Sequence, residues 1–596
     1  MIENPMMIAA RAEQAMREGR LVEALADLAK LKSLVPQDPQ VYLMSAFAQR
    51  ASGDAQQAKI EFRKALELGP NDIGIRGQFA SWLYDIGDFD DAVAEFDYIL
   101  RLQPRHLDAQ IDRALALAKT DRRDEGIEAL RMIAKLNGDA LRAWSNLAIL
   151  LREDLQYVDA EAAAQHILSH DPGHTRAHHI IAQCAYEQGR PSAALFAHAN
   201  EKSPDDLQII AALAAALIGE DEGEKALELI ETRVAANPGW AHGHSILADY
   251  RWQFSGEADF GRSFAAALKQ MPDNAELWSN YISLTSRALG HEAALELIAE
   301  ARSSLEDAGG LDLMEANSRS ELGEYDKAEA LFARSDLESL PESQLSFVRF
   351  LTRSKRFEEC AKQAEMLVDQ GHGADAWPYV SIAWRMLEDA RWEWLEGNEA
   401  FVQAIDIDGF GDKLPKLAEK LRELHKFNVQ PIAQSLRGGT QTEAALFSDS
   451  TPIIKTLVKH LRRAIAGYLE GLPEPDPTHP LLGAPREAIR FTGSWSVRLS
   501  DAGFHASHIH NQGVVSSAFY VALPDTMGDG KNNAHEGWLA VGEPPPEFNT
   551  GLPPIRMVQP KPGRLVLFPS TMWHGTRPFG GGERLTCAFD VGLLGK

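Results

Sequence analysis

Residues Ala58–Pro70 read Ala-Lys-Ile-Glu-Phe-Arg-Lys-Ala-Leu-Glu-Leu-Gly-Pro, and this pattern recurs along the N-terminal part of the chain. Small Ala58 and Ala65 let two helices approach closely, whereas Phe62 is large enough to fill the space between neighbouring helix pairs. These three residues precede Pro70 by 12, 8 and 5 positions. The same offsets hold for Ala92, Phe96 and Ile99 before Pro104, and for Ala160, Ala164 and Ile167 before Pro172.

The residue that closes each pattern recurs every 34 positions. A proline cannot continue the hydrogen-bond ladder of a helix, so it ends the second helix of a pair. The positions are Pro36, Pro70, Pro104, Gly138 and Pro172, then Pro204 after 32 residues, and Pro238 and Pro272 at the original step. This period is typical of tetratricopeptide repeats. We predict an all-α tetratricopeptide solenoid over residues 1–396, with a concave surface that binds a protein or peptide.

Length and composition narrow the class of protein. A chain of 596 residues is too long for a single core, so we expect a multidomain protein. The net charge of −26 argues against nucleic acid or an anionic membrane as partner. The three cysteines form no CxxC pair, which disfavours a zinc ribbon or a disulfide framework. We see no signal-peptide pattern and no apolar run near the ~20 residues that span a bilayer, and therefore predict a cytoplasmic protein without membrane contact.

Residues 397–490 are predicted to be the helical, connecting part of the C-terminal domain. Apolar spacing favours helices over 414–424 and 453–469, and Phe401–Ile407 is a candidate first strand. The polar, glycine-rich stretch Ser435–Thr442 is interpreted as a turn, and the alternative is a loop that lines the active site. It lacks the GxxxxGK[ST] spacing of a phosphate loop, so no nucleotide site is predicted.

From residue 491 onward, short strands dominate. Ser494–Leu499 alternates polar and apolar residues, as a half-buried strand does. Further strands are expected at Ser516–Leu523, Arg564–Phe568 and Arg584–Val591. Short strands separated by Gly, Pro and Asn loops indicate a jelly-roll barrel. We predict that residues 491–596 form a double-stranded β-helix core, flanked by the helices of the preceding region.

Three histidines in this core are candidate metal ligands. His508 and His510 are two residues apart, and on a β-strand that spacing places both imidazoles on one face. His574 follows the strand that ends at Pro569. An iron(II) site takes ligands from one face, commonly two histidines and a carboxylate, and keeps adjacent positions open. Here the pair is His-x-His instead of His-x-Asp, and the preferred ligand set is His508, His510 and His574.

Two other ligand sets stay open. A carboxylate could complete the site, the candidates being Asp501, Asp525 and Glu536. Otherwise only one histidine of the His-x-His pair binds together with His574. His505 has the opposite strand parity to the pair, so we expect it to point away from the site.

Five stretches within residues 400–596 carry a family pattern. They are Arg437-Gly-Gly-Thr-Gln-Thr, Gly493-Ser-Trp-Ser-Val-Arg-Leu, Gly503-Phe-His-x-x-His-x-His, Ser516-Ser-Ala-Phe-Tyr-Val-Ala-Leu-Pro, and Pro562-Gly-Arg-Leu-Val-Leu-Phe-Pro-Ser-x-x-Trp-His with Arg584. In these stretches the chain resembles the bacterial 2-oxoglutarate/Fe(II)-dependent oxygenases that contain tetratricopeptide repeats. The resemblance implies Fe(II) as cofactor, with dioxygen and 2-oxoglutarate converted to succinate and carbon dioxide while a substrate is hydroxylated.

Arg584 lies ten residues after His574, at the start of a strand. 2-Oxoglutarate binds iron through its keto acid end, and a guanidinium can hold the free far carboxylate with two parallel hydrogen bonds. Thr586 lies on the same strand face and can add a hydroxyl donor. Arg498 and Tyr520 are further candidate contacts for the co-substrate. The predicted catalytic residues are His508, His510, His574 and Arg584.

The sequence thus predicts an Fe(II)/2-oxoglutarate-dependent dioxygenase that hydroxylates a protein or peptide recruited by the repeats. One alternative is a cupin-type metal enzyme, because Gly503-x4-His-x-His, Gly563-x5-Pro569 and His574 also approximate cupin motifs. Arg584 separates these two, since a cupin that does not use 2-oxoglutarate has no need of it. The other alternative is a tetratricopeptide scaffold without catalysis.

Overall fold

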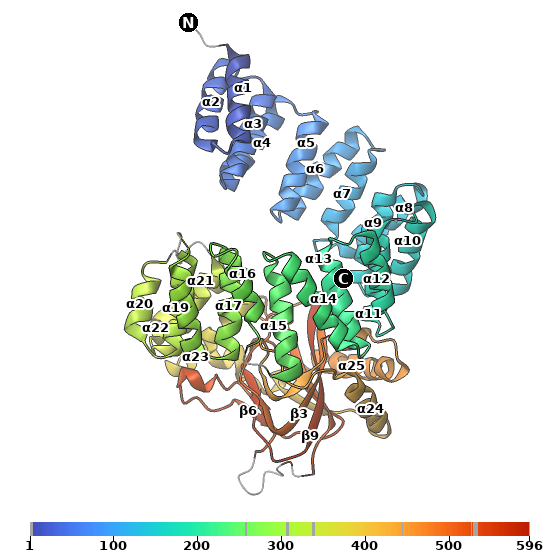
Figure 1. Ribbon diagram of the computed structural model, residues 1–596, viewed down its shortest axis with the longest axis vertical. Helices are drawn as coiled ribbons and strands as arrows, with labels where there is room; N and C mark the ends of the chain where they lie inside the picture. Colours follow the sequence, from blue (N-terminus) through green and yellow to red (C-terminus); the bar gives the residue numbers. More distant parts are fainter. Residues whose placement is uncertain are drawn as a thin grey trace. The chain divides into compact units, whose positions relative to one another are not determined.

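The computed structural model describes residues 4–594, apart from 257–258, 306–308, 336–339, 444, 526 and 528–534. Contacts between residues divide the chain into two compact units, Met1–Ile181 and Ala182–Lys596. Figure 1 shows helices from the blue to the yellow part of the chain and strands in its red part. The predicted domain limits at residues 396 and 490 lie inside the second unit and stay predictions.

The first unit is built from pairs of helices. Its helices are α1 Pro5–Arg17, α2 Leu21–Leu34, α3 Pro39–Ala51, α4 Ala55–Leu68, α5 Ile73–Asp85, α6 Phe89–Leu102, α7 Leu107–Leu117, α8 Arg123–Leu136, α9 Leu141–Glu153 and α10 Tyr157–His170. The second helix of each pair ends two residues before Pro36, Pro70, Pro104, Gly138 or Pro172. The predicted role of the periodic proline as a helix stop is therefore confirmed.

Turns and ring contacts explain the rest of the repeat pattern. Gly53 and Gly87 join the two helices of a pair with φ angles of 85° and 83°, a conformation that glycine adopts at little cost. Phe62 of α4 stacks on Phe79 and Trp82 of the next repeat, with ring centroids 5.1 and 5.3 Å apart. Phe62 thus fills the space between its own repeat and the next.

Helix pairs continue through the second unit, past Pro272, where the sequence period weakens. The helices are α11 Thr175–Glu187, which crosses the division between the units, α12 Ala193–Lys202, α13 Leu207–Gly219, α14 Gly223–Ala236, α15 Ala241–Ser255, α16 Arg262–Leu268, α17 Ala275–Ala288, α18 His291–Arg302, α19 Gly309–Glu321, α20 Tyr325–Phe332, α21 Pro341–Arg353, α22 Phe357–Asp369 and α23 Gly373–Met386. In the described parts of the chain, every helix is too short or too polar to cross a bilayer.

The C-terminal strands form two antiparallel sheets. Their strands are β1 Gln403–Asp406, β2 Leu436–Gln441, β3 Ala488–His505, β4 Val515–Ala522, β5 Leu539–Val541, β6 Arg556–Val558, β7 Arg564–Pro569, β8 His574–Thr576 and β9 Glu583–Leu594. The larger sheet has the order β1-β7-β4-β9-β3-β2, and the smaller has the order β6-β5-β8. This curled, jelly-roll-like arrangement after a tetratricopeptide solenoid confirms the predicted fold class.

The interpretation of Ser435–Thr442 as a turn is wrong, because this stretch contains strand β2. Strand β2 pairs with β3 from Leu436 opposite His505 to Gln441 opposite Val497, with a bulge between Arg437 and Gly439. A Cβ atom at Gly439 would lie 2.3 Å from the carbonyl oxygen of Arg498. The glycines therefore allow a bulge and a close approach of two strands, and not a reversal of the chain.

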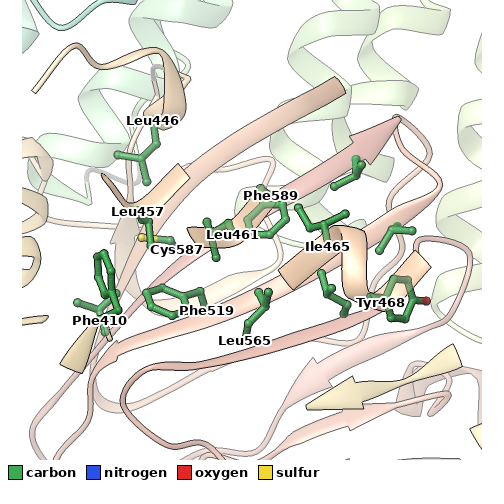
Figure 2. Close-up of a cluster of buried hydrophobic side chains, with 14 of the residues drawn as sticks. Phe410, Leu446, Leu457, Leu461, Ile465, Tyr468, Phe519, Leu565, Cys587 and Phe589 are labelled. Carbon is green, nitrogen blue, oxygen red and sulfur yellow. The ribbon is translucent and has the colours of Figure 1, made fainter. Parts of the chain in front are cut away.

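Strand β9 presents its two faces to different surroundings. Leu585, Cys587 and Phe589 are fully buried on the face covered by helices α24 Leu414–Leu424 and α25 Pro452–Glu470. Figure 2 shows Leu457, Leu461 and Ile465 of α25 in the same buried cluster as Cys587 and Phe589. Both helices match their predicted positions. Their apolar faces bury one side of the large sheet, so the residues of opposite parity face the inside of the barrel.

The inner face of the large sheet packs against the small sheet. Tyr520, Val566 and Phe568 of the large sheet form one buried cluster with Leu539 and Val541 of the small sheet. Most of the space between the two sheets is filled by apolar side chains, and a polar group buried there needs a partner. The polar side chains that point inward lie on β9 and β4.

The last repeats and the barrel share a hydrophobic core. Trp573 and Phe548 of the barrel are buried with Tyr379 of α23, and the rings of Trp573 and Tyr379 have centroids 5.7 Å apart. The indole nitrogen of Trp573 donates to the carbonyl of Pro378 at 3.1 Å. Ile509 packs against the same core. The two segments that carry the candidate histidines are therefore anchored directly to the solenoid.

Replacing Trp573 by alanine tests this anchoring. We expect Trp573→Ala to lower the free energy of unfolding of the second unit by about 3–5 kcal/mol, because a large buried ring and its hydrogen bond are lost. Trp394, which is 37% exposed, provides a matched control with a smaller expected loss. Urea unfolding monitored by circular dichroism gives both values. Equal losses for the two tryptophans would contradict a shared core.

Candidate metal centre

Backbone hydrogen bonds hold the two histidine-bearing segments side by side. Strand β3 ends at His505, so the His-x-His pair lies on an extension beyond the strand and not within it. The N–H of His508 donates to the carbonyl of His574 at 3.0 Å, and the N–H of His574 donates back at 2.9 Å. The N–H of His510 donates to the carbonyl of Ser570 at 3.2 Å. This bridge brings residues some sixty positions apart in sequence into contact.

The imidazole rings of His508, His510 and His574 converge. The ring centroids are 4.3 Å apart for His508 and His574, 5.0 Å for His508 and His510, and 4.9 Å for His510 and His574. One nitrogen of each ring lies within 4.8 Å of the others. Within the described residues, these histidines are the one group of three or more His, Cys, Asp or Glu side chains with such a geometry.

Hydrogen bonds orient all three rings in the same way. The Nδ1 atom of His508 lies 2.8 Å from the carbonyl oxygen of Ala506, and that of His574 lies 3.0 Å from the carbonyl oxygen of Met572. The Nδ1 atom of His510 lies 2.7 Å from a carboxylate oxygen of Asp590. A carbonyl or carboxylate can only accept, so each Nδ1 carries the proton. Each Nε2 then keeps the lone pair that a metal ligand needs.

Burial favours the neutral form of two of these rings. It lowers the pKa of His508 to about 3 and places that of His574 well below its ordinary value. The neighbouring histidines act in the same direction, since a second positive charge nearby would be repelled. Neutral imidazole is the form that binds a metal ion, so these rings need no deprotonation at neutral pH.

Sequence reasoning missed Asp590, the carboxylate behind His510. The hydroxyl of Ser516 donates to the same carboxylate at 2.6 Å and lies 2.9 Å from the hydroxyl of Ser570. Asp590 and Ser516 face each other across strands β9 and β4, and both are buried. The sequence did contain a signal for Asp590. It lies an even number of residues from Arg584 along β9, so both side chains point to the inner face.

The remaining ligand candidates lie outside the three-histidine cluster. The ring of His505 stacks beside that of His508 with centroids 5.8 Å apart, and its Nδ1 lies 3.3 Å from the hydroxyl of Ser435. The side chains of Asp525 and Glu536 are exposed and are not part of the cluster. The side chain of Asp501 is outside the described residues. The geometry therefore brings together the preferred set, whose role as ligands stays a prediction.

Arg584 and Tyr520 form a buried polar pair inside the barrel. Arg584 is 2% exposed, and its guanidinium carbon lies 5.3 Å from the centre of the Tyr520 ring. One guanidinium nitrogen donates to the carbonyl of Gly537 at 3.1 Å. Within the described part of the chain, the Nε of Arg584 and the hydroxyl of Tyr520 find no hydrogen-bond partner beyond this pair, and no carboxylate forms a salt bridge with Arg584.

Burial without a counter-ion is unfavourable for both groups. It lowers the pKa of Arg584 and raises the pKa of Tyr520, and each shift reflects the cost of removing a charged form from water. A carboxylate placed between them would accept hydrogen bonds from both groups and neutralise the guanidinium. The pair is thus suited to bind a carboxylate group of a ligand.

Thr586 and Arg498 occupy opposite sides of the sheet. Thr586 is buried and lies opposite Tyr520 across β4 and β9, on the inner face. Arg498 lies on the outer face, where its Nε donates to Glu583 at 2.7 Å, and Glu583 also binds Arg422. The structure brings Thr586 together with the buried pair and does not bring Arg498 there. The co-substrate contact predicted for Arg498 stays a prediction.

Two family models match the chain. Residues 493–590 match the family described as "Putative 2OG-Fe(II) oxygenase", and residues 79–140 and 145–206 match the tetratricopeptide repeat. The first match spans the three histidines, Arg584 and Asp590. These findings confirm the resemblance seen in the sequence and point to a dioxygenase. No curated protein matches the chain.

Solved structures resemble parts of the solenoid. A tetratricopeptide repeat protein from Parabacteroides merdae is 19% identical, covers 38% of this chain and 91% of its own, and has a TM-score of 0.33. MamA from Desulfovibrio magneticus is 23% identical, covers 28% of this chain and 92% of its own, and has a TM-score of 0.24. PilF from Pseudomonas aeruginosa is 16% identical, covers 34% of this chain and 94% of its own, and has a TM-score of 0.28.

Removing the carboxylate behind His510 tests the metal centre. We expect Asp590→Ala to weaken the binding of Fe(II) or Co(II) about 10- to 100-fold, because the ring of His510 loses the acceptor that fixes its orientation. Asp590→Asn keeps a neutral acceptor and should lose less. Calorimetric titration under nitrogen measures the affinities. Asp406, on the outer edge strand β1, supplies the control Asp406→Ala, and an Asp590→Ala affinity equal to that of the control would rule out this role.

Proposed function

We propose that this protein is an Fe(II)/2-oxoglutarate-dependent dioxygenase that hydroxylates a protein or peptide recruited by its repeats. The observation that carries the proposal is the combination of two unsatisfied sites on one barrel. Three histidines each present one ring nitrogen within 4.8 Å of the others, and the buried cation Arg584 lacks a counter-ion beside the buried hydroxyl of Tyr520. A metal ion and a dicarboxylate co-substrate satisfy both.

The residues of the chain take distinct tasks in this proposal. His508, His510 and His574 hold Fe(II), which, when bound with 2-oxoglutarate, supplies the activation of dioxygen for oxidation of a C–H bond. Arg584, Tyr520 and Thr586 bind and orient the far carboxylate of the co-substrate. Asp590 and Ser516 keep the ring of His510 in place. The buried aromatic and aliphatic side chains around Tyr520 exclude water from the pocket.

Titration of the metal-free protein tests the proposal. Addition of Fe(II) and then 2-oxoglutarate without oxygen should produce the visible charge-transfer band of the iron chelate. We expect Arg584→Ala to raise the 2-oxoglutarate concentration for half of the band about 100-fold or more, because a buried charge-assisted contact is lost. Tyr520→Phe should raise it about tenfold. Neither change should alter Fe(II) binding.

The same titration separates the alternatives. Arg498→Ala is the matched control, since it removes an arginine from the outer face of the same sheet. If this variant also needs more 2-oxoglutarate for half of the band, Arg498 is a co-substrate contact after all. Fe(II) binding without the band would favour a cupin-type enzyme that does not use 2-oxoglutarate. Failure to bind any metal would favour a non-catalytic scaffold.

A further inference from the structure

A cavity of about 840 Å³ lies between the last repeats and the His-x-His segment. His508 and His510 line its barrel side, and the first helices of the repeat pairs, from α17 to α23, line its opposite side. Its size is near the upper end for ligand pockets in proteins. Any substrate that reaches the three histidines by this route must therefore contact the repeats.

Each of these helices turns one narrow stripe towards the cavity. On α17 the stripe includes Ser283, Ser286 and Arg287, and on α21 it includes Ser346 and Arg349. The spacings of three and four residues place such side chains on one helix face. The stripes are rich in hydroxyl and guanidinium groups, which suit a polar substrate and not an apolar one.

We call the side of the cavity that the repeats line its repeat wall, or simply the wall. The charged side chains on this wall differ in how closely they are paired. Arg353 lies 2.5 Å from Glu321, so this carboxylate is already occupied. Arg349 is 4.0 Å from the same Glu321, too far for a hydrogen bond. Asp375, another carboxylate of the wall, accepts a hydrogen bond from Asn511 at 2.9 Å. Arg349 therefore shares Glu321 with Arg353 and forms only a long ion pair with it.

Arg287 is another positively charged residue on this wall. In the part of the chain that the structure describes, it forms no salt bridge. Two exposed guanidiniums line the same cavity, Arg287 without a salt bridge in the described structure and Arg349 with only a long, shared one. Together they form a local anion site on a protein whose overall charge repels anions.

We propose that this wall selects the substrate, and that the substrate is an extended peptide with acidic side chains. Its carboxylates bind Arg349 and Arg287, while its backbone amides find hydrogen-bond partners among Ser283, Ser286, Asn317 and Ser346. A neighbouring residue of the bound peptide then faces His508 and His510. The peptide-binding site is inferred from the residues that line the cavity. Only the oxidation of the bound peptide rests on the proposed function.

Fluorescence anisotropy on the full-length, metal-free protein tests this inference. The probe is a fluorescein-labelled nonapeptide of alternating Glu and Ala with blocked ends, and its counterpart carries Gln in place of every Glu. We expect the Glu peptide to bind and the Gln peptide to bind at least tenfold more weakly. Arg349→Gln and Arg287→Gln should each weaken binding of the Glu peptide about tenfold, and both together about 100-fold.

A matched control comes from α25. Arg463 is an exposed arginine outside the cavity, so Arg463→Gln should bind the Glu peptide like the unchanged protein. The exposure of Arg287 and Arg349 predicts unchanged urea midpoints, which verifies that the variants fold. Equal binding of the Glu and Gln peptides, or of the double variant and the control, would overturn the inference. Arginine-dependent binding without a charge-transfer band would support the peptide site and reject the oxygenase.

Discussion

Burial of both faces of strand β9 is the constraint on which the barrel and its site depend. On one face, Leu585, Cys587 and Phe589 pack under helices α24 and α25. On the other, Arg584 and Asp590 stand inside the barrel. A slip of one residue in the pairing of β9 would turn the apolar set inward and the polar set into the helices. Because the helix-covered core fixes this register, it also fixes where the polar groups of the site lie.

The repeats act on the site through packing as well as through the cavity. Ile509 separates His508 from His510, and Trp573 directly precedes His574, and both apolar residues pack into the core of the last repeats. The histidines therefore adjoin residues that pack into another part of the chain. This arrangement holds the three rings without a long regular strand. Because Ile509 and Trp573 directly adjoin the histidines in sequence, a movement of the last repeats would also move the three rings.

Incompletely paired charges mark the two places where we propose that a ligand binds. The buried guanidinium of Arg584 has no counter-ion in the described structure, and this is costly inside a barrel. Arg349 and Arg287 are exposed, so their weak or missing pairing costs little, and it suits the proposed recognition of an acidic peptide. A buried charge such as Arg584 suits one co-substrate that is always the same. Exposed charges such as Arg349 and Arg287 suit partners that bind and leave.

The sequence by itself determined the repeats and the jelly-roll class and gave His508, His510, His574 and Arg584 as the preferred site residues, because these follow from local periods and from motif order. It did not reveal the strand at Ser435–Thr442, since glycines there serve a bulge that only its partner strand β3 explains. Tertiary structure alone decided that Asp590 stands behind His510 and that Arg498 faces outward. These outcomes depend on which strands are neighbours and in what register, and long-range burial sets both.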